Sequence, residues 1–239
     1  MFSHLDLLFS STPLEGPEQM ALDEVLLRQI SSPLLRLYCW KAPCVTFGYF
    51  QEWKKVQAAF PGRTLVRRWS GGGSVEHDRD MTFSLIVPAS KTPKTIARIP
   101  PSFFYQYLHQ AIVETLHAFK IDARLINSEE TKEGSSCFTA PSLHDIVIQD
   151  QKIAGGAQRR CAGSLLHQGS LNYVGRWKMA DGRWDEVLDP SVMGKSLFTS
   201  LAKRLSPSVN LIAEEQAWLE EAVSVATQRY RTTAWTQKR

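Results

Sequence analysis

The amino-acid sequence predicts one α+β domain that ends in a small helical part. Short segments with strand-like patterns recur along most of the 239 residues, and a few segments of helical spacing lie between them. No proline- and serine-rich linker divides the chain, so no second domain is indicated. We therefore expect a main domain over residues 1–205 and a helical C-terminal extension of the same domain over residues 206–239.

The helices are predicted from apolar side chains that recur every three or four positions. Gly16-Pro17 begins one such segment, since proline is favoured in a first helical turn. We expect helices over residues 16–30, 53–60, 102–119 and 210–230. The apolar stripe of the clearest helix comprises Phe103, Phe104, Tyr107, Leu108, Ile112, Leu116 and Phe119.

The strands are predicted from runs of β-branched, aromatic and alternating apolar residues. Glycine and proline close several of these runs, as at Pro43, Gly71 and Pro88. Residues 145–154 are typical of a hairpin with its turn near residues 149–151, whereas the polar residues 127–136 indicate a loop. We expect further strands over residues 4–10, 34–40, 45–50, 64–69, 81–87, 123–126 and 164–173.

Composition and charge exclude several classes of protein. The chain has 28 lysines and arginines, 24 acidic residues and a formal net charge of +4, which suits an acidic partner but does not indicate nucleic-acid binding. Its four cysteines form no Cys-x-x-Cys pair, so we expect no disulfide scaffold and no metal site. No apolar run is long enough to span a membrane, and the N-terminus lacks the basic start of a signal peptide. We therefore expect a cytoplasmic protein with no membrane partner.

The first candidate site is the glycine-rich segment at residues 67–73, Arg-Arg-Trp-Ser-Gly-Gly-Gly. Consecutive glycines allow positive φ angles and a close approach of the backbone to a ligand, and their N–H groups can surround an anion. Arg67 and Arg68 could hold a carboxylate or phosphate by charge-assisted hydrogen bonds. A hairpin turn with two solvated arginines explains the same residues equally well, and the glycine spacing is not that of a dinucleotide-binding motif.

The second candidate is Cys137, which lies between the polar loop and an expected strand. A thiol in such a position can be accessible, and His144 could activate it as a nucleophile. From these residues alone, an inert cysteine and a surface histidine are the favoured interpretation.

The third candidate is Lys152, which is followed by small residues at 154–157. A lysine beside small residues can line a narrow pocket, although an exposed lysine on a hairpin is the alternative. Downstream, His167 is interpreted as a structural histidine with satisfied hydrogen bonds. Residues 193–196, Met-Gly-Lys-Ser, are not a P-loop, because Asp189 stands where the first glycine of that motif belongs.

In this order and spacing, the three segments resemble the biotin/lipoate A/B protein ligase superfamily, and within it the lipoate–protein ligases and octanoyltransferases. The strongest motifs are Arg-Arg-x-Ser-Gly-Gly-Gly-x-Val-x-His-Asp at 67–78 and Asp-Ile-x-x-x-x-x-Lys-Ile-x-Gly-x-Ala-Gln at 145–158. Weaker motifs lie at 20–24 and 43–51. The resemblance implies a mixed, mainly antiparallel sheet flanked by helices, like the catalytic core of class II aminoacyl-tRNA synthetases, with residues 1–205 as the catalytic domain.

The resemblance also implies which residues hold the substrate. Lys152 would contact the activated acyl carbonyl, where a lysine can stabilise the negative charge that develops during attack. The other residues implied to bind the acyl chain or an acyl-adenylate are Arg68, Ser70, Gly71, Gly72, Gly73, His77, Asp145, Gly155 and Ala157.

Two mechanisms fit this resemblance. In a ligase, which Asp145 favours slightly, ATP and Mg²⁺ convert lipoate or octanoate to an acyl-adenylate that a carrier lysine attacks. In an octanoyltransferase, Cys137 takes octanoyl from acyl carrier protein as a thioester, and the carrier lysine attacks without ATP or any other cofactor. Larger ligases have an accessory domain after this region, so the short C-terminal part favours the transferase, or a ligase that lacks the accessory domain or takes it from a separate chain. A degenerate, non-catalytic binder of lipoyl domains is a third alternative.

The implied acceptors are the lipoyl domains of 2-oxoacid dehydrogenase E2 subunits and the glycine cleavage H protein. The acyl donor is lipoate or octanoate for a ligase, and octanoyl-acyl carrier protein for a transferase. Lipoyl domains are generally acidic, so a mildly basic enzyme would attract them. We expect no nucleic-acid partner.

Overall fold

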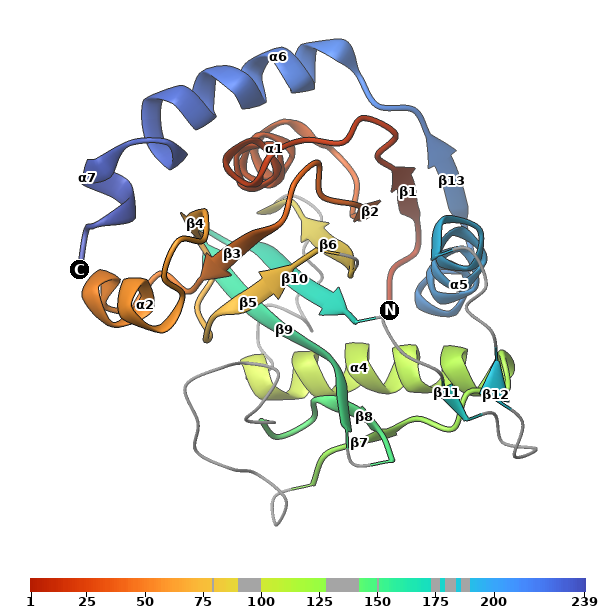
Figure 1. The fold of residues 1–239 in the computed structure, drawn as a ribbon. Helices are drawn as coiled ribbons and strands as arrows, with labels where there is room; N and C mark the ends of the chain where they lie inside the picture. The colour runs from red at the N-terminus through yellow and green to blue at the C-terminus, as the bar shows by residue number, and fades with distance from the viewer. Residues whose placement is uncertain are drawn as a thin grey trace.

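A computed structural model of the chain shows an eight-stranded main sheet with helices on both faces (Figure 1). The structure describes residues 1–78, 80–89, 100–127, 142–149, 151–172, 177–178, 184–185 and 190–239. The strands of the main sheet are β1 Leu5–Phe9, β2 Leu34–Tyr38, β6 Met81–Val87, β7 Arg124–Leu125, β8 Ile146–Ile148, β9 Gln151–Cys161, β10 Ser164–Leu171 and β13 Val209–Ile212. They lie in the order β13-β1-β2-β6-β10-β9-β8-β7.

Most neighbouring strands of the main sheet are antiparallel. The pairs from β2 through β6, β10, β9 and β8 to β7 are all antiparallel, whereas β1 is parallel to both β2 and β13. The predicted mixed, mainly antiparallel sheet is therefore confirmed. The predicted hairpin is also present, because β8 and β9 are joined by a turn in which Gln149 has a φ of 49°.

A separate three-stranded sheet forms beside the main sheet. Its central strand is β3 Cys44–Phe47, which is parallel to β4 Leu65–Arg67 and antiparallel to β5 Val75–His77. The sequence did not predict β5, because its three residues directly follow the glycine-rich segment. Two short strands, β11 Trp177–Lys178 and β12 Trp184–Asp185, pair with each other.

The apolar core lies in two layers on opposite faces of the main sheet. Successive strand residues alternate between the layers, so that Leu34 packs with α1 and its neighbour Leu35 packs with α4 and α5. Figure 1 shows α6 lying across α1, on the side of the sheet away from α4. The helices are α1 Gly16–Gln29, α2 Trp53–Ala59, α4 Pro101–Ala118, α5 Pro190–Leu205, α6 Gln216–Val225, the π-helical turn η2 Ala226–Tyr230, and α7 Thr233–Thr236.

The stripe predicted for α4 is only partly buried. Phe104, Leu108 and Leu116 are fully buried, but Phe103 and Tyr107 are 63% and 50% exposed. The two exposed residues are four positions apart, so they share a face that is turned about 100° from the buried one. The helix is therefore confirmed, and its apolar stripe comprises a buried row and an exposed pair.

The C-terminal part differs from the prediction in two places. Residues 209–212 form a strand rather than the start of a helix, because β13 pairs with the edge of β1. Helix α5 was not predicted, and it places Gly194, Lys195 and Ser196 inside a helix, which agrees with the rejection of a P-loop. Within the described ranges, no helix is both long and apolar enough to cross a membrane.

Two buried histidines lie between α4 and the main sheet. The Nδ1–H of His109 donates to the carbonyl oxygen of His144 at 2.8 Å, but its Nε2 has no hydrogen-bond partner. Neither ring nitrogen of His167 has a partner, so the expectation of a satisfied histidine was wrong. Gly156 leaves no room for a polar group there, since an added Cβ would lie 2.6 Å from Nε2 of His167.

Burial lowers the pKa of His109 to about 4, and it lowers the pKa of His167 well below the ordinary range. An unfolded histidine has a pKa of about 6.5, so the unfolded chain takes up a proton first as the pH falls. Stability is therefore lost between about pH 6.5 and pH 4, and His109 accounts for about 3 kcal/mol of that loss at most.

The variant His109→Gln should consequently show a shallower fall in the free energy of unfolding from pH 6.5 to pH 4.5 than the unchanged protein. Urea unfolding at several pH values measures this slope. Gln110→Ala, which alters an exposed and non-titrating side chain of the same helix, is the control and should retain the original slope. Equal slopes for all three proteins would mean that His109 titrates normally in the folded state.

Candidate functional site

A cavity of about 450 Å³ lies between the small sheet and the central strands of the main sheet. This volume falls within the roughly 300–1,000 Å³ that is typical of small-molecule sites. The small sheet and the glycine-rich segment form one wall, and strands β2, β6, β10 and β9 form the floor. The start of α4 and residues 142–145 complete the lining.

The floor of the cavity is a row of residues that crosses four strands. Gly155 pairs with Ser170, Ser170 with Thr82, and Thr82 with Tyr38, so all four lie side by side on one face of the sheet. Adjacent strands are about 4.8 Å apart, so the row is roughly 14 Å long from β9 to β2. Such an elongated floor suits an extended chain better than a compact ring.

Arg68 holds the glycine-rich segment over this floor. Its guanidinium donates to the carbonyl oxygens of Gly71 at 2.8 Å and Gly73 at 2.6 Å. Gly72 between them has a φ of 82°, which side-chain-bearing residues rarely adopt. Gly48 allows the close approach from below, because an added Cβ there would lie 2.0 Å from the carbonyl oxygen of Gly72. We refer to residues 71–73 as the glycine loop.

Arg67 does not face the cavity, contrary to the expectation that both arginines could hold an anion. Its guanidinium is buried and donates to the carbonyl oxygens of Tyr49 and Gln51, both at 2.8 Å. Its Nε donates to the carbonyl oxygen of Thr236 at 3.1 Å. Because each of these acceptors is a backbone carbonyl, Arg67 joins the C-terminal segment to the turn after β3 instead of binding a ligand.

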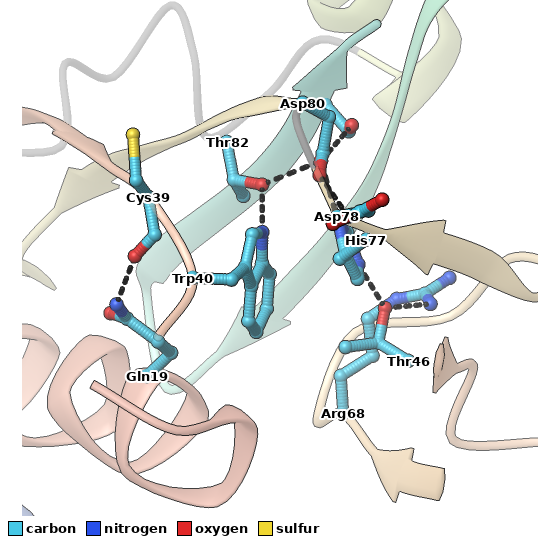
Figure 2. Close-up of polar contacts among 10 residues, drawn as sticks. Gln19, Cys39, Trp40, Thr46, Arg68, His77, Asp78, Asp80 and Thr82 are labelled. Carbon is cyan, nitrogen blue, oxygen red and sulfur yellow. Dashed lines mark hydrogen bonds and ion pairs between the residues drawn. The ribbon is translucent and has the colours of Figure 1, made fainter. Parts of the chain in front are cut away.

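A chain of hydrogen bonds connects Arg68 to Asp80 along the cavity wall (Figure 2). Arg68 donates to the hydroxyl of Thr46 at 3.1 Å, and this hydroxyl lies 2.8 Å from Nε2 of His77. The other ring nitrogen of His77 lies 2.7 Å from Oδ2 of Asp80. Burial alone would raise the pKa of the Asp80 carboxyl, but the charge of His77 and the hydrogen bonds that Asp80 accepts outweigh burial and lower it.

Lys152 lies at the far end of the cavity in a buried ion pair with Asp145. Its Nζ is 2.6 Å from Oδ2 of Asp145, and the two side chains are only 5% and 2% exposed. The backbone N–H of Ser142 donates to the same oxygen at 2.6 Å, and the hydroxyl of Tyr105 donates to Oδ1 at 2.5 Å. The N–H of Gly156 in turn donates to the Tyr105 hydroxyl at 2.8 Å. These contacts fix the direction of the Lys152 ammonium.

Ser70 stands behind the cavity rather than in its lining. Its hydroxyl donates to the side-chain oxygen of Gln168 at 2.6 Å, and the amide nitrogen of Gln168 donates to Asp23 at 2.8 Å. Asp23 also accepts from Ser84 at 2.6 Å and pairs with Arg36 at 2.8 Å. This buried network gives the motif at 20–24 a structural role, because it ties α1 to the main sheet and to the glycine-rich segment.

The structure brings most of the residues implied by the resemblance to one cavity. Cys137 lies outside the described residues, so the structure places no thiol in the site. Cys39, Cys44 and Cys161 are described, and none of them lines the cavity. The implied residues that line it are Arg68, Gly71, Gly72, Gly73, His77, Asp145, Lys152, Gly155 and Ala157.

Sequence reasoning missed three residues that shape the cavity. Thr46 lies within the motif at 43–51, whose role was left open, and Trp40 precedes that motif by three residues. Tyr105 lies in α4, where the apolar stripe indicates only packing against the core. It follows the buried Phe104 and stands outside that stripe, and a polar aromatic residue at such a position is the signal that could have indicated a role in the site.

The described lining residues offer few groups for ATP and Mg²⁺ that are not already bonded within the protein. Asp145 is the one carboxylate among the described lining residues, and both its oxygens already accept hydrogen bonds within the protein. Arg68 donates to carbonyl oxygens of its own loop. In the part of the chain that the structure describes, no three histidine, cysteine or acidic side chains are grouped to hold a metal ion.

The fold encloses a cavity that has a buried lysine in its lining. The chain belongs to the family of the lipoyl protein ligase A/B catalytic domain, whose family model matches residues 15–221. It is therefore an enzyme that transfers an acyl group to a protein lysine, as the resemblance implied.

Its curated relatives include octanoyltransferases named LipM. The protein from Staphylococcus epidermidis is 34% identical over 182 residues, which cover 68% of this chain but 64% of the relative. The protein from Staphylococcus aureus is 30% identical over 224 residues, which cover 86% of this chain and 72% of the relative. The chain thus spans slightly less than two thirds of the S. epidermidis relative.

The solved structure of protein Ta0514 from T. acidophilum, which has lipoic acid bound, matches the whole chain. The TM-score is 0.72, and the match covers 100% of both chains at 21% sequence identity. At this level of identity the likeness shows the fold alone, and it confirms the architecture that the resemblance implied.

The close approach at Gly48 gives a direct test of how the glycine loop is held. Gly48→Ala should lower the free energy of unfolding by about 1–3 kcal/mol, because the new methyl group overlaps the backbone of Gly72. Gly71→Ala is the matched control, since a Cβ there meets only the Phe50 ring at 3.9 Å. Denaturant unfolding should show little change for the control. If both variants lost the same free energy of unfolding, the close approach of Gly48 to the Gly72 backbone would be contradicted.

Proposed function

We propose that this enzyme is an octanoyltransferase that takes an octanoyl group from acyl carrier protein onto Cys137 and passes it to the lysine of a lipoyl domain. The observation that carries the proposal is the buried Lys152–Asp145 pair at one end of an elongated cavity. Two relatives at 34% and 30% identity bear the name octanoyltransferase, which supports this choice.

The proposal replaces the slight preference for a ligase that Asp145 suggested. In the structure Asp145 is the partner of Lys152 and accepts from Tyr105 and Ser142, so its presence does not need ATP chemistry as an explanation. The relatives named octanoyltransferases likewise favour the ATP-independent alternative. The reaction then requires only the two carrier proteins and this chain.

In the first step the thiolate of Cys137 attacks the thioester carbonyl of the acyl carrier protein. A new carbon–sulfur bond forms to Cys137, and the carbon–sulfur bond to the carrier breaks. The carrier thiolate leaves and takes up a proton, so the oxidation state of every atom is unchanged. The thiolate is the reactive form of cysteine, so a nearby base or cation promotes this step.

In the second step the neutral amine of the acceptor lysine attacks the acyl-enzyme. An amide bond forms, the bond to Cys137 breaks, and the thiolate regained on Cys137 is again ready for a donor. The amine loses a proton to solvent during this step, which balances the proton that the carrier thiolate took up in the first step. Octanoyl transfer from a thioester to an amine is favourable without ATP, because an amide is more stable than a thioester.

Lys152 is suited to stabilise the oxyanion that forms in both steps. A fixed cation near the carbonyl oxygen lowers the energy of the transition state, and it does so most strongly where water is excluded. Asp145 and Tyr105 keep the ammonium in place, so little reorganisation is needed when the charge develops.

The cavity floor supplies binding energy for the acyl chain. Each methylene group transferred from water to an apolar site contributes about 0.8 kcal/mol. A donor whose acyl chain is two carbons shorter than octanoyl should therefore react about 15-fold more slowly when the donor concentration is low. The acyl chain obtains this binding free energy only while the glycine loop covers it and excludes water.

An acylation assay with an apo lipoyl domain as acceptor tests the proposed function. Octanoyl-acyl carrier protein alone should octanoylate the acceptor, whereas octanoate with ATP and Mg²⁺ should not. Cys137→Ala should lower the rate by at least about 10³-fold, as expected when a nucleophile is removed. The modified acceptor is measured by mass spectrometry.

Two other cysteines provide matched controls. Cys39→Ala and Cys161→Ala alter exposed thiols that do not line the cavity, so both variants should retain the unchanged rate. Acylation that needs ATP and survives Cys137→Ala would instead favour the ligase. No acylation from either donor would favour the non-catalytic binder of lipoyl domains.

A further inference from the structure

We propose that Asp80, His77 and Thr46 act as positioning residues that hold Arg68 and the glycine loop closed over the acyl chain. Together with Arg68 they form what we call the wall relay, and it determines how tightly the enzyme holds chains of different length. The inference rests on the proposed function for the identity of the chain. It goes beyond that function because it assigns roles to residues that do not contact the reacting carbonyl.

When the His77 ring is neutral, the directions of the hydrogen bonds in the wall relay follow from Arg68 and from the Asp80 carboxylate. A guanidinium can only donate, so the hydroxyl oxygen of Thr46 accepts from it at 3.1 Å. The hydroxyl hydrogen of Thr46 is then directed at Nε2 of His77, 2.8 Å away. Because Nε2 accepts, the ring proton of neutral His77 is on Nδ1, which donates to Asp80 at 2.7 Å. The structure thus assigns a single tautomer to His77.

Asp80 anchors the wall relay to the floor of the cavity. Its Oδ2 also accepts from the hydroxyls of Ser170 at 2.5 Å and Thr82 at 3.0 Å, and both residues belong to the floor. Its Oδ1 accepts from the backbone N–H of Asp78 at 3.2 Å. The relay therefore connects the floor to the glycine loop above it, and its geometry sets the gap between them.

The same residues hold an aromatic side chain in the cavity lining. The indole N–H of Trp40 donates to Thr82 at 2.8 Å, and the Trp40 ring stacks on His77 with centroids 4.0 Å apart (Figure 2). Trp40 also lies edge-on to Tyr38, at the β2 end of the floor, with ring centroids 5.6 Å apart. A shift of His77 would thus move both the glycine loop and the aromatic surface that a long chain reaches.

Burial makes the wall relay sensitive to the loss of one hydroxyl. Thr46 is 2% exposed, His77 3%, and Asp80 and Arg68 5% each. In a buried site, a donor or acceptor that loses its partner destabilises the folded protein by more free energy than the hydrogen bond itself had contributed. Removal of the Thr46 hydroxyl leaves Nε2 of His77 without its donor and Arg68 without one acceptor, so the loop loses part of its support.

The wall relay is separate from the carbonyl end of the cavity. None of the hydrogen bonds described for Thr46, His77 or Asp80 involves Lys152 or Asp145. A change in the relay should therefore alter acyl binding in the ground state and the transition state equally. Such a change raises KM and leaves kcat nearly constant.

The test compares Thr46→Val, which removes the hydroxyl and keeps the shape, with Thr46→Ser, which keeps the hydroxyl. With octanoyl-acyl carrier protein as donor, Thr46→Val should raise KM about tenfold with kcat within about twofold. Its preference for octanoyl over hexanoyl donors should also fall, whereas Thr46→Ser should retain both the KM and the preference. Val and Ser variants with the same KM and the same preference would overturn the proposal.

A direct measurement of octanoate binding tests the wall relay independently of the proposed function. Isothermal titration with octanoate should show weaker binding to Thr46→Val than to Thr46→Ser, whether or not the enzyme turns over its donor. If the unchanged protein fails to octanoylate a lipoyl domain but these affinities differ, the proposed function fails and the wall relay stands. Equal affinities in the two variants would overturn the relay.

The tautomer of His77 gives a readout that needs no substrate. In protein labelled with ¹⁵N-histidine, long-range ¹H–¹⁵N spectra at neutral pH should show His77 protonated on Nδ1 and unprotonated on Nε2. Thr46→Ser should give the same pattern, and Thr46→Val should shift the Nε2 resonance because its hydrogen-bond donor is gone. A His77 protonated on Nε2 in the unchanged protein would overturn the assigned relay.

Discussion

The hydrogen bonds that Arg68 makes to its own glycine loop are the interaction on which the site depends. A segment of three glycines has no side chains to hold its shape, so another group must satisfy its carbonyl oxygens. Arg68 donates to two of them and, through Thr46, reaches the small sheet. The cavity between the two sheets exists in its described form because this one guanidinium holds the loop above the floor.

The two ends of the cavity use charge in different ways. At one end, Lys152 is fixed by Asp145, and our proposal places the reacting carbonyl beside it. Along the wall, Arg68 and Asp80 are connected through Thr46 and His77, and we propose that they shape the cavity instead of serving the reaction. This difference between the two parts of the cavity suits an octanoyl chain, because the chain has a polar thioester at one end and only methylene groups beyond it.

Much of the fold could be predicted from the sequence, because it depends on local patterns. The helix α4, the hairpin of β8 and β9, and the antiparallel sheet all have periodic apolar residues or turn residues that indicate them. The strand β13 could not be predicted in the same way, since its four residues form a strand only because the edge of β1 is available. Helix α5 has apolar residues at helical spacing, but the glycine within it is unfavourable in a helix interior, so its local pattern is a weak signal.

The candidate site was predicted less completely, and for a physical reason. Lys152 and the glycine loop stand out because each is an unusual residue type in its local context. Thr46 and Tyr105 are ordinary residues whose importance comes from partners far away in the chain, 31 positions for Thr46 and His77 and 40 for Tyr105 and Asp145. Arg67 and Arg68 are adjacent and chemically identical, yet only the folded structure shows that one faces the cavity and the other faces the C-terminal segment.

The central claim is that acyl transfer passes through a covalent enzyme, and rapid-quench mass spectrometry measures this intermediate directly. When octanoyl-acyl carrier protein is mixed with the enzyme in the absence of ATP, peptide mapping should find an octanoyl thioester on Cys137 within one turnover. Addition of an apo lipoyl domain should remove it at a rate no slower than kcat. A lipoyl domain that becomes octanoylated while Cys137 stays unmodified, or an adduct that persists after the acceptor is added, would contradict the account.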